Sequence, residues 1–356
     1  MYTVENKKPY VATYKEIIIG FAAFTLILIL LYPKDLLKQQ VLSEDANYDL
    51  SMLYLKNMLQ NDPNNEELMF NLAKQSLRGN KRDLAYRLLK LLKSSKNKKI
   101  QQKTYLLSYK IAKEDYYYLI KDKKYTEAKK LLQEMRELNR FIILQHLYSP
   151  KDLEWLYKES LFLQDKQSAY FLIQKLLLQN PKVEYFQTAY YLANELHHYD
   201  AALNYLDMLI QKDSQHRRKW QEAKYYILYH YKSPQLAQAF LEQEAQKSTY
   251  WREKLSQFYL GNKKYKEAAD NYMQLFSKSN SYKQRLYYWM QALKSLQAGN
   301  YLKEAGRLAD KYQKDFFGNK KARIFLLKLY LAVNDLKRAN RLAKKMLKLK
   351  QRKKQQ

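Results

Sequence analysis

A small residue recurs along most of the chain at intervals close to 34 residues. In several copies it follows a turn, an aromatic or apolar residue and two variable residues, as at 125–128 (YTEA) and 265–268 (YKEA). Self-similarity at a period of this length is typical of proteins built from stacked repeats rather than around one central core. The nine small residues, 31 to 43 positions apart, are Ser51, Ala85, Ala128, Ala169, Ala202, Ala237, Ala268, Ala305 and Ala339.

The residue four positions after each small residue tests whether these segments are helical, because positions i and i+4 share one face of a helix. Pro63 and Pro181 lie twelve residues after two of the small residues, where a helix is expected to end. We therefore expect two antiparallel helices per copy, which approach most closely at the small residue. The residues at the fourth position are all apolar or aromatic: Leu55, Leu89, Leu132, Ile173, Leu206, Leu241, Tyr272, Ala309 and Ala343.

The composition favours an all-α fold. Of 356 residues, only six are Gly and six are Pro, and none is Cys. Such low Gly and Pro contents disfavour β-sandwiches, barrels and glycine-rich phosphate loops. The absence of Cys excludes disulfide frameworks, thiolate catalysis and Cys-based zinc sites.

The repeat resembles the tetratricopeptide repeat (TPR), whose pattern is W-x2-L-G-x2-Y, then A-x3-F, then P over 34 residues. The resemblance runs from Ala46 to Lys350 and includes an aromatic residue before the small residue and Trp289 near the start of a first helix. It implies a right-handed α-solenoid of about nine degenerate helical hairpins; a generic α-solenoid is the alternative. At the position in the first helix where the family has Gly or Ala, this register places a tyrosine in four repeats: Tyr116, Tyr157, Tyr190 and Tyr225. The helices of those repeats are then either splayed apart, or the repeats are offset by one residue from this alignment.

In TPR proteins the inner faces of the first helices line a groove that holds a peptide or a partner domain. A mixture of Lys and Tyr there would suit an acidic peptide, or a sugar polymer that stacks on the rings while its acidic groups meet the ammonium groups. The alternative is a solvated face with core tyrosines. By register, the resemblance assigns to this groove Phe70, Lys74, Lys110, Lys113, Tyr117, Lys158, Tyr191, Asn194, Tyr287, Lys294 and Lys328.

An uncharged apolar run, Ile17–Leu31, precedes the repeats. It covers roughly 22 Å as a helix, and flanking tyrosines and lysines could extend it toward the ~30 Å of a bilayer core. A buried core helix and a cleaved signal peptide are the alternatives. Against a core helix, the run has no polar stripe, which such a helix normally keeps. Against a signal peptide, no small residues follow the run to form a cleavage site. The run therefore predicts an uncleaved membrane anchor.

The distribution of lysines around this run favours a cytoplasmic N-terminus and a periplasmic C-terminal domain in the inner membrane of a bacterium, with the opposite orientation as the alternative. The expected organisation is a short cytoplasmic tail over 1–16, the anchor over 17–32, a linker over 33–46, the TPR region over 47–350 and a basic tail over 351–356.

Nothing in the sequence indicates catalysis. The five histidines show neither HExxH nor a His/carboxylate pair at i, i+4 spacing, and no nucleophile motif, Walker loop or dinucleotide fingerprint is present. The formal net charge is +30, but a nucleic-acid interface would also need that charge concentrated in one groove with stacking aromatics. We expect no enzyme, no metal, no cofactor and no nucleic-acid partner.

The order of anchor and repeats is similar to the TPR region of Pel-type exopolysaccharide export proteins. That resemblance implies a scaffold for protein–protein interactions that couples a membrane synthase, periplasmic enzymes and an outer-membrane pore. The alternatives are a periplasmic chaperone or translocon-associated TPR subunit, which would capture many weak partners, and a direct polysaccharide-binding module.

Overall fold

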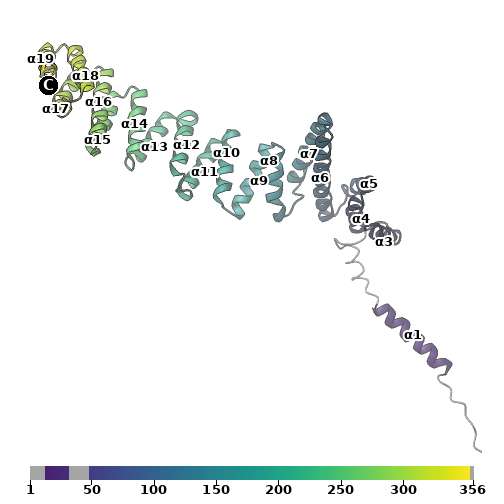
Figure 1. The fold of residues 1–356 in the computed structure, drawn as a ribbon. Helices are drawn as coiled ribbons and strands as arrows, with labels where there is room; N and C mark the ends of the chain where they lie inside the picture. The colour runs from purple at the N-terminus through teal and green to yellow at the C-terminus, as the bar shows by residue number, and fades with distance from the viewer. Residues whose placement is uncertain (1–12, 32–47, 353–356) are drawn as a thin grey trace, which may run out of the picture. The chain divides into compact units, whose positions relative to one another are not determined.

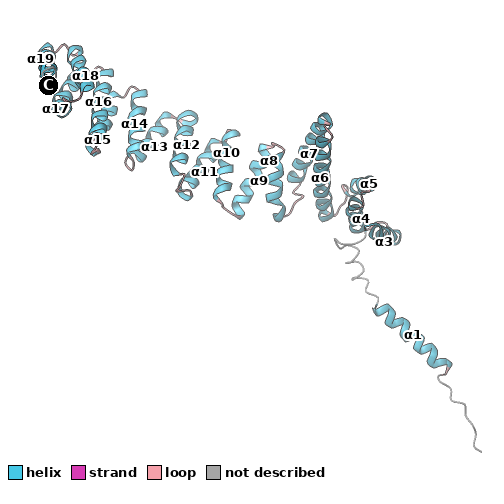
Figure 2. Cartoon of the chain, viewed as in Figure 1, coloured by secondary structure: helices cyan, strands magenta, loops and turns pink. Residues whose placement is uncertain are grey.

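The computed structural model describes residues 13–31 and 48–352, and every regular element within those ranges is helical (Figure 1 and Figure 2). The chain divides into two compact units, Met1–Asn180 (unit 1) and Pro181–Gln356 (unit 2). The all-α prediction is confirmed for this part of the chain, while the handedness of the repeat stays a prediction. The expected tails and linker, 1–16, 33–46 and 351–356, lie mostly outside the described residues.

Among its described residues, unit 1 contains α1, α3 and three packed helical hairpins, α4–α5, α6–α7 and α8–α9. The two longest described helices are α6 and α7, with 24 and 20 residues, and a short 3-10 helix, η1, follows them. These insertions explain the wide spacing of the small residues on either side of Ala128. The elements are α1 (Tyr14–Leu31), α3 (Tyr48–Asn61), α4 (Glu66–Arg78), α5 (Arg82–Leu92), α6 (Lys98–Lys121), α7 (Tyr125–Leu144), η1 (Pro150–Asp152), α8 (Leu153–Phe162) and α9 (Lys166–Gln179).

Unit 2 contains five helical hairpins among its described residues, α10–α11 to α18–α19. A π-helical segment, η2, joins the helices of the second hairpin. The elements are α10 (Val183–Glu195), α11 (Tyr199–Lys212), α12 (Arg217–Ile227), η2 (Leu228–Lys232), α13 (Pro234–Ala245), α14 (Thr249–Gly261), α15 (Tyr265–Lys278), α16 (Tyr282–Ala298), α17 (Leu302–Phe316), α18 (Lys320–Ala332) and α19 (Leu336–Arg352).

The nine small residues occupy one structural position. Each is the fourth residue of its helix, in α3, α5, α7, α9, α11, α13, α15, α17 and α19. Their exposed fractions lie between 0% and 3%. A side chain no larger than that of Ala or Ser lets the helix approach its partner at this point, as the sequence pattern requires.

The turn within a hairpin has its own regularity. Five residues before seven of the small residues, the backbone is left-handed, with φ between 55° and 61°. The next backbone N–H reaches back to a carbonyl five residues earlier, as from Lys81 to Ser76 (2.7 Å) and from Lys264 to Tyr259 (2.8 Å). This is the Schellman arrangement that ends a helix, and Gly usually occupies its left-handed position. Here the residues are Asn80, Lys123, Gln164, His197, Lys263, Asn300 and Asn334.

Because a non-glycine side chain is strained in this conformation, Lys123→Gly should stabilise the protein. The relieved strain, about 1–2 kcal/mol, exceeds the 0.5–1 kcal/mol that the flexible unfolded glycine costs, so we expect a gain of about 0.5–1 kcal/mol. Asn80→Gly should gain less, because Asn tolerates left-handed backbone. Urea unfolding followed by circular dichroism measures both values, and a loss of stability in Lys123→Gly would contradict this account of the turn.

The α12–α13 hairpin departs from the pattern. Its turn passes through η2, and Ser233 then caps α13 by accepting the N–H of Leu236 at 3.2 Å, with Pro234 as the first helical residue. Glu244, seven residues after the small residue Ala237, is buried. It accepts a hydrogen bond from the Nε2 of Gln221 at 2.6 Å and pairs with Lys247 at 2.8 Å. These contacts satisfy the buried carboxylate of Glu244 within the hairpin.

The tyrosines at the position reserved for Gly or Ala are accommodated by aromatic neighbours. Tyr157 and Tyr190 are buried, whereas Tyr116 and Tyr225 are half-buried. The Tyr190 ring lies 6.0 Å from that of Trp220 on α12, and the Tyr116 ring 5.8 Å from that of Phe162 on α8. In these two cases the extra bulk is directed toward the first helix of the following hairpin.

Asp165 links the second and third hairpins of unit 1. Its Oδ2 accepts hydrogen bonds from the Nε of Arg140 (2.6 Å) and the hydroxyl of Ser168 (2.8 Å), and the side chain caps α9. Burial by itself raises the pKa of this carboxyl, but the bonds from Arg140 and Ser168 outweigh burial and hold the pKa below its usual value. The charged form therefore contributes stability above the pKa of the unfolded chain, about 3.9, and this contribution is lost as pH falls through the lower folded value.

We expect Asp165→Asn to lower the unfolding free energy by about 1.5–3 kcal/mol near neutral pH, since a charge-assisted hydrogen bond is lost. The difference from the parent should shrink as pH falls below the unfolded pKa, about 3.9, and through the lower pKa of the folded carboxyl. Urea titrations from neutral to acidic pH measure the difference in unfolding free energy between the variant and the parent. A pH-independent difference would show that the ionised carboxylate is not the stabilising species.

The prediction of a membrane anchor over 17–32 is wrong. Helix α1 has 18 residues, and its first turn contains Lys15 and Glu16. The apolar run that remains is roughly 22 Å long, less than the ~30 Å of a bilayer core, and the sequence interpretation relied on the flanking residues to close that gap. Within the described ranges, no helix combines the length and the apolar character needed to cross a bilayer. The expected single-pass inner-membrane location, with a periplasmic C-terminal domain, is corrected accordingly.

Candidate functional site

Three of the predicted groove residues, Lys110, Lys113 and Tyr117, share one face of α6. They are spaced at i, i+3 and i+7, so their side chains lie above one another along the helix. This face is directed at α8, where Trp155, Glu159 and Phe162 are spaced at i, i+4 and i+7 and so also share one helix face. We call the surface formed by Tyr109, Lys110, Lys113, Tyr117, Trp155, Glu159 and Phe162 the α6–α8 face.

A buried carboxylate holds the two helices in register. Glu159 is 5% exposed. The Nζ of Lys113 lies 2.7 Å from both of its carboxylate oxygens, and the hydroxyl of Tyr109 donates to Oε2 at 2.9 Å. Burial, and then the adjacent Glu159 charge, raise the pKa of Tyr109, so the phenol stays a hydrogen-bond donor. The charge of Lys113 is thereby neutralised inside the protein.

The rest of the face combines cations with aromatic rings. Lys113 Nζ lies 4.8 Å from the centre of the Phe162 ring, and Lys110 Nζ lies 5.6 Å from that of Trp155. The rings of Tyr109 and Trp155 are nearly perpendicular, with their centres 5.4 Å apart. Lys110 is exposed and forms no ion pair with any described residue. The face can therefore offer one uncompensated positive charge beside apolar ring surface.

Tyr117 forms the outer end of the face. Its side chain is 53% exposed, although its ring lies 5.6 Å from Tyr116 and 6.3 Å from Phe162. A phenol held by its neighbours in this way loses little conformational freedom when a ligand covers it. Together with Lys110 it provides an exposed anchor pair about two helical turns apart.

The other predicted groove residues are distributed over α4, α8, α10, α16 and α18. In unit 1, Phe70 and Lys74 are half-buried, and Lys158 is exposed and paired with Glu154 at 2.8 Å. In unit 2, Tyr191, Tyr287, Lys294 and Lys328 are exposed and Asn194 is half-buried. The structure thus gathers part of the predicted set into one face and leaves the remainder on separate helices.

A smaller aromatic and basic cluster occurs in unit 2. The Nζ of Lys219 on α12 lies 5.9 Å from the centre of the Tyr191 ring and 4.5 Å from that of Trp220. The Trp220 indole donates to Asp213 at 3.0 Å. This cluster lacks a buried carboxylate beneath its lysine, so it differs in chemistry from the α6–α8 face.

Sequence reasoning missed the residues that α8 contributes. Trp155 and Phe162 are spaced at i and i+7, which a search for aromatic residues on first helices could have found. Glu159 gave no usable signal, because a single acid in a helix is normally exposed and its partner Lys113 lies 46 residues away.

The described residues contain no group of three His, Cys, Asp or Glu side chains that could hold a metal ion. The histidines that sequence analysis examined have local partners instead. His197 lies at the α10–α11 turn, with its Nδ1 2.8 Å from the hydroxyl of Tyr199, and His216 pairs with Asp213 at 3.1 Å.

No protein-family model and no curated protein matches the chain. Among solved structures, it is similar to a chain of the Naa15/Naa10 complex bound to HypK-THB, with 14% identity, a TM-score of 0.38 and coverage of 79% of this chain and 41% of that chain. It is also similar to the human IFIT1 dimer with PPP-AAAA, with 15% identity, a TM-score of 0.19 and coverage of 85% and 69% respectively. This chain therefore spans less than half of the first of these proteins.

These similarities are too weak to transfer a function. The class of the protein follows from its own hairpins, with their buried small residue and left-handed turn: within the described residues it is built from repeated helical hairpins.

Proposed function

We propose that this protein is a non-enzymatic scaffold and that the α6–α8 face binds an acidic, partly apolar segment of a partner protein. The observation that carries the proposal is that exposed Lys110 and Tyr117 lie on one helix face, which the part-buried Lys113–Glu159 ion pair stiffens. Tyrosine and a positioned cation are typical anchors of protein interfaces, because they offer a large contact area and directional polar groups.

The charge of the face favours a segment with isolated acidic residues over a polyanion. A nucleic acid or a densely charged polymer needs a row of free cations to replace its counterions. On this face Lys113 is already neutralised by Glu159, and Lys110 supplies the remaining charge. One carboxylate flanked by apolar side chains matches one ammonium group flanked by rings.

The arrangement of the rings also disfavours a neutral polysaccharide. Sugar binding uses an open aromatic face on which the ring stacks. Lys110 lies over Trp155 and Lys113 lies over Phe162. Among the aromatic residues of this face, Tyr117 is more than half exposed. A chain of sugars could therefore stack on one ring only.

The proposal predicts that Lys110→Ala combined with Tyr117→Ala weakens binding of an acidic peptide at least tenfold, about 1.4 kcal/mol. The probe is a fluorescent peptide of alternating Glu and Leu, with a Lys and Leu peptide as the charge control. Isothermal titration calorimetry gives Kd, and circular dichroism checks that helicity is unchanged.

A matched control uses the same residue types on the next helix. Tyr125 and Lys129 are exposed on α7, so Tyr125→Ala combined with Lys129→Ala removes an equal charge and a similar ring elsewhere. Its Kd should stay within about twofold of the parent's. An equal loss in both double variants would indicate attraction by the overall charge and would refute the α6–α8 face as the site.

The expected role in Pel-type exopolysaccharide export rested on the order of anchor and repeats. The anchor is corrected above, and no feature of the described residues supports this role. The chaperone-type alternative stays a prediction, recognisable by many weak partners in a pull-down.

A further inference from the structure

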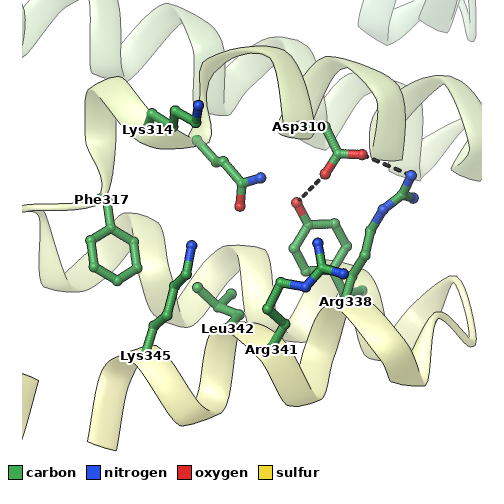
Figure 3. A pocket seen from close by; sticks show the side chains of 9 residues that line it. Asp310, Lys314, Phe317, Arg338, Arg341, Leu342 and Lys345 are labelled. Carbon is green, nitrogen blue, oxygen red and sulfur yellow. Dashed lines mark hydrogen bonds and ion pairs between the residues drawn. The ribbon is translucent and has the colours of Figure 1, made fainter. Parts of the chain in front are cut away.

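A cavity of about 520 Å³ lies between α17 and α19, beside α18 and on different helices from the α6–α8 face (Figure 3). Helix α17 supplies Asp310 and Lys314 to its lining, and α19 supplies Arg338, Arg341 and Lys345. Its volume falls within the range of small-molecule sites, about 300–1,000 Å³. Four of its side chains are cationic and one is anionic.

The single carboxylate is fully engaged. Asp310 Oδ1 accepts the hydroxyl of Tyr330 at 2.9 Å, and Oδ2 pairs with the Nη2 of Arg338 at 2.8 Å. Arg338 also pairs with Asp335 at 3.0 Å. Tyr330 is 1% exposed, so this group forms a fixed wall of the cavity. Figure 3 shows both dashed contacts on one side of the opening.

The other cations have no such compensation. Among the described residues, Lys314, Arg341 and Lys345 form no ion pair. They border the same opening, Lys314 from one helix and Arg341 and Lys345 from the other (Figure 3). Three like charges around one cavity repel one another, and an anion of matching charge would remove that repulsion.

We propose that this cavity binds a small soluble molecule that carries a phosphate or diphosphate group. A phosphate presents several oxygens and close to two negative charges, which suits an Arg fork and two Lys ammonium groups better than a single carboxylate would. Phe317 and Leu342 line the cavity beside these cations and would contact the uncharged part of the ligand.

The test measures binding of inorganic pyrophosphate to the full chain by isothermal titration calorimetry, with acetate as the monoanion control. Lys314→Gln combined with Lys345→Gln should raise the Kd for pyrophosphate at least tenfold. The matched variant, Lys311→Gln combined with Lys344→Gln, removes one lysine charge from each of the same two helices. Both of those residues are exposed and lie outside the cavity lining, so its Kd should stay within about twofold of the parent's.

Equal losses in the two double variants would overturn the proposal, as would the absence of saturable pyrophosphate binding or acetate binding of equal strength. Thermal unfolding by circular dichroism shows that the variants are folded. If Lys314→Gln with Lys345→Gln unfolds, Arg341→Gln alone takes its place, with the same expected weakening. These substitutions leave the α6–α8 face untouched, so this result and the acidic-peptide result are independent.

Discussion

Trp289→Ala should lower the unfolding free energy by about 3–5 kcal/mol, because removing a large buried aromatic side chain loses its burial and leaves a cavity. Trp289 is fully buried on α16 in the core formed by α15–α19. Its ring lies 4.9 Å from that of Phe316, and its indole N–H donates to the carbonyl of Leu308 on α17 at 3.4 Å. The loss should destabilise these helices first, since repeat proteins are stabilised mainly by contacts between neighbouring helices.

Urea unfolding followed by circular dichroism measures the effect, and hydrogen exchange locates it. Tyr287→Ala is the control, because this aromatic residue lies two positions away on the same helix and is exposed. We expect it to cost less than about 1 kcal/mol. Similar losses for the two variants would mean that Trp289 is not a core residue.

The second large effect tests the small-residue position itself. Ala237→Leu places three further carbon atoms where α13 packs against its neighbours, and Ala237 is fully buried. Overpacking of this kind costs about 1–3 kcal/mol. Ala239 lies on the same helix but is exposed, so Ala239→Leu should change stability by less than about 0.5 kcal/mol.

Both variants exchange the same residue types two positions apart, so helix propensity cancels in the comparison. The measurement is the difference between their unfolding free energies in urea. If Ala239→Leu were the more damaging of the two, the repeat register derived from the sequence would be incorrect at this hairpin.

The fold could be predicted because the small residue at the closest helix contact recurs in the sequence at intervals close to 34 residues. A helix can pack closely only where its side chain is small, and that requirement fixes Ser51 and the eight alanines at the fourth residue of their helices. The turns gave no comparable signal. Their left-handed positions hold Lys, Gln, His or Asn, so the Gly that usually marks such a turn is missing from the sequence. Contacts within the hairpin hold these residues in a conformation that is strained for a non-glycine residue.

The candidate site could be predicted in part. Lys110, Lys113 and Tyr117 followed from the helical register, since spacing along one helix is a local property. Their α8 neighbours depend on how two hairpins stack, and a buried acid such as Glu159 is stable only because Lys113 and Tyr109 reach it. The α17–α19 cavity was missed for the same reason, because residues of two helices must come together to form it.

The membrane prediction failed on length. The composition of the apolar run was read correctly, but Lys15 and Glu16 lie within the first turn of α1 and shorten its apolar part. Flanking residues cannot replace apolar length in the centre of a bilayer.

Photo-crosslinking tests the central claim, that the α6–α8 face receives an acidic segment, most directly. Benzoylphenylalanine is introduced at position 117, and at position 125 as the control, and each protein is irradiated with the Glu and Leu peptide and analysed by mass spectrometry. The account predicts a crosslinked product at position 117 that an excess of unlabelled peptide suppresses, and little at position 125. Equal crosslinking at the two positions, or crosslinking at 125 alone, would contradict it.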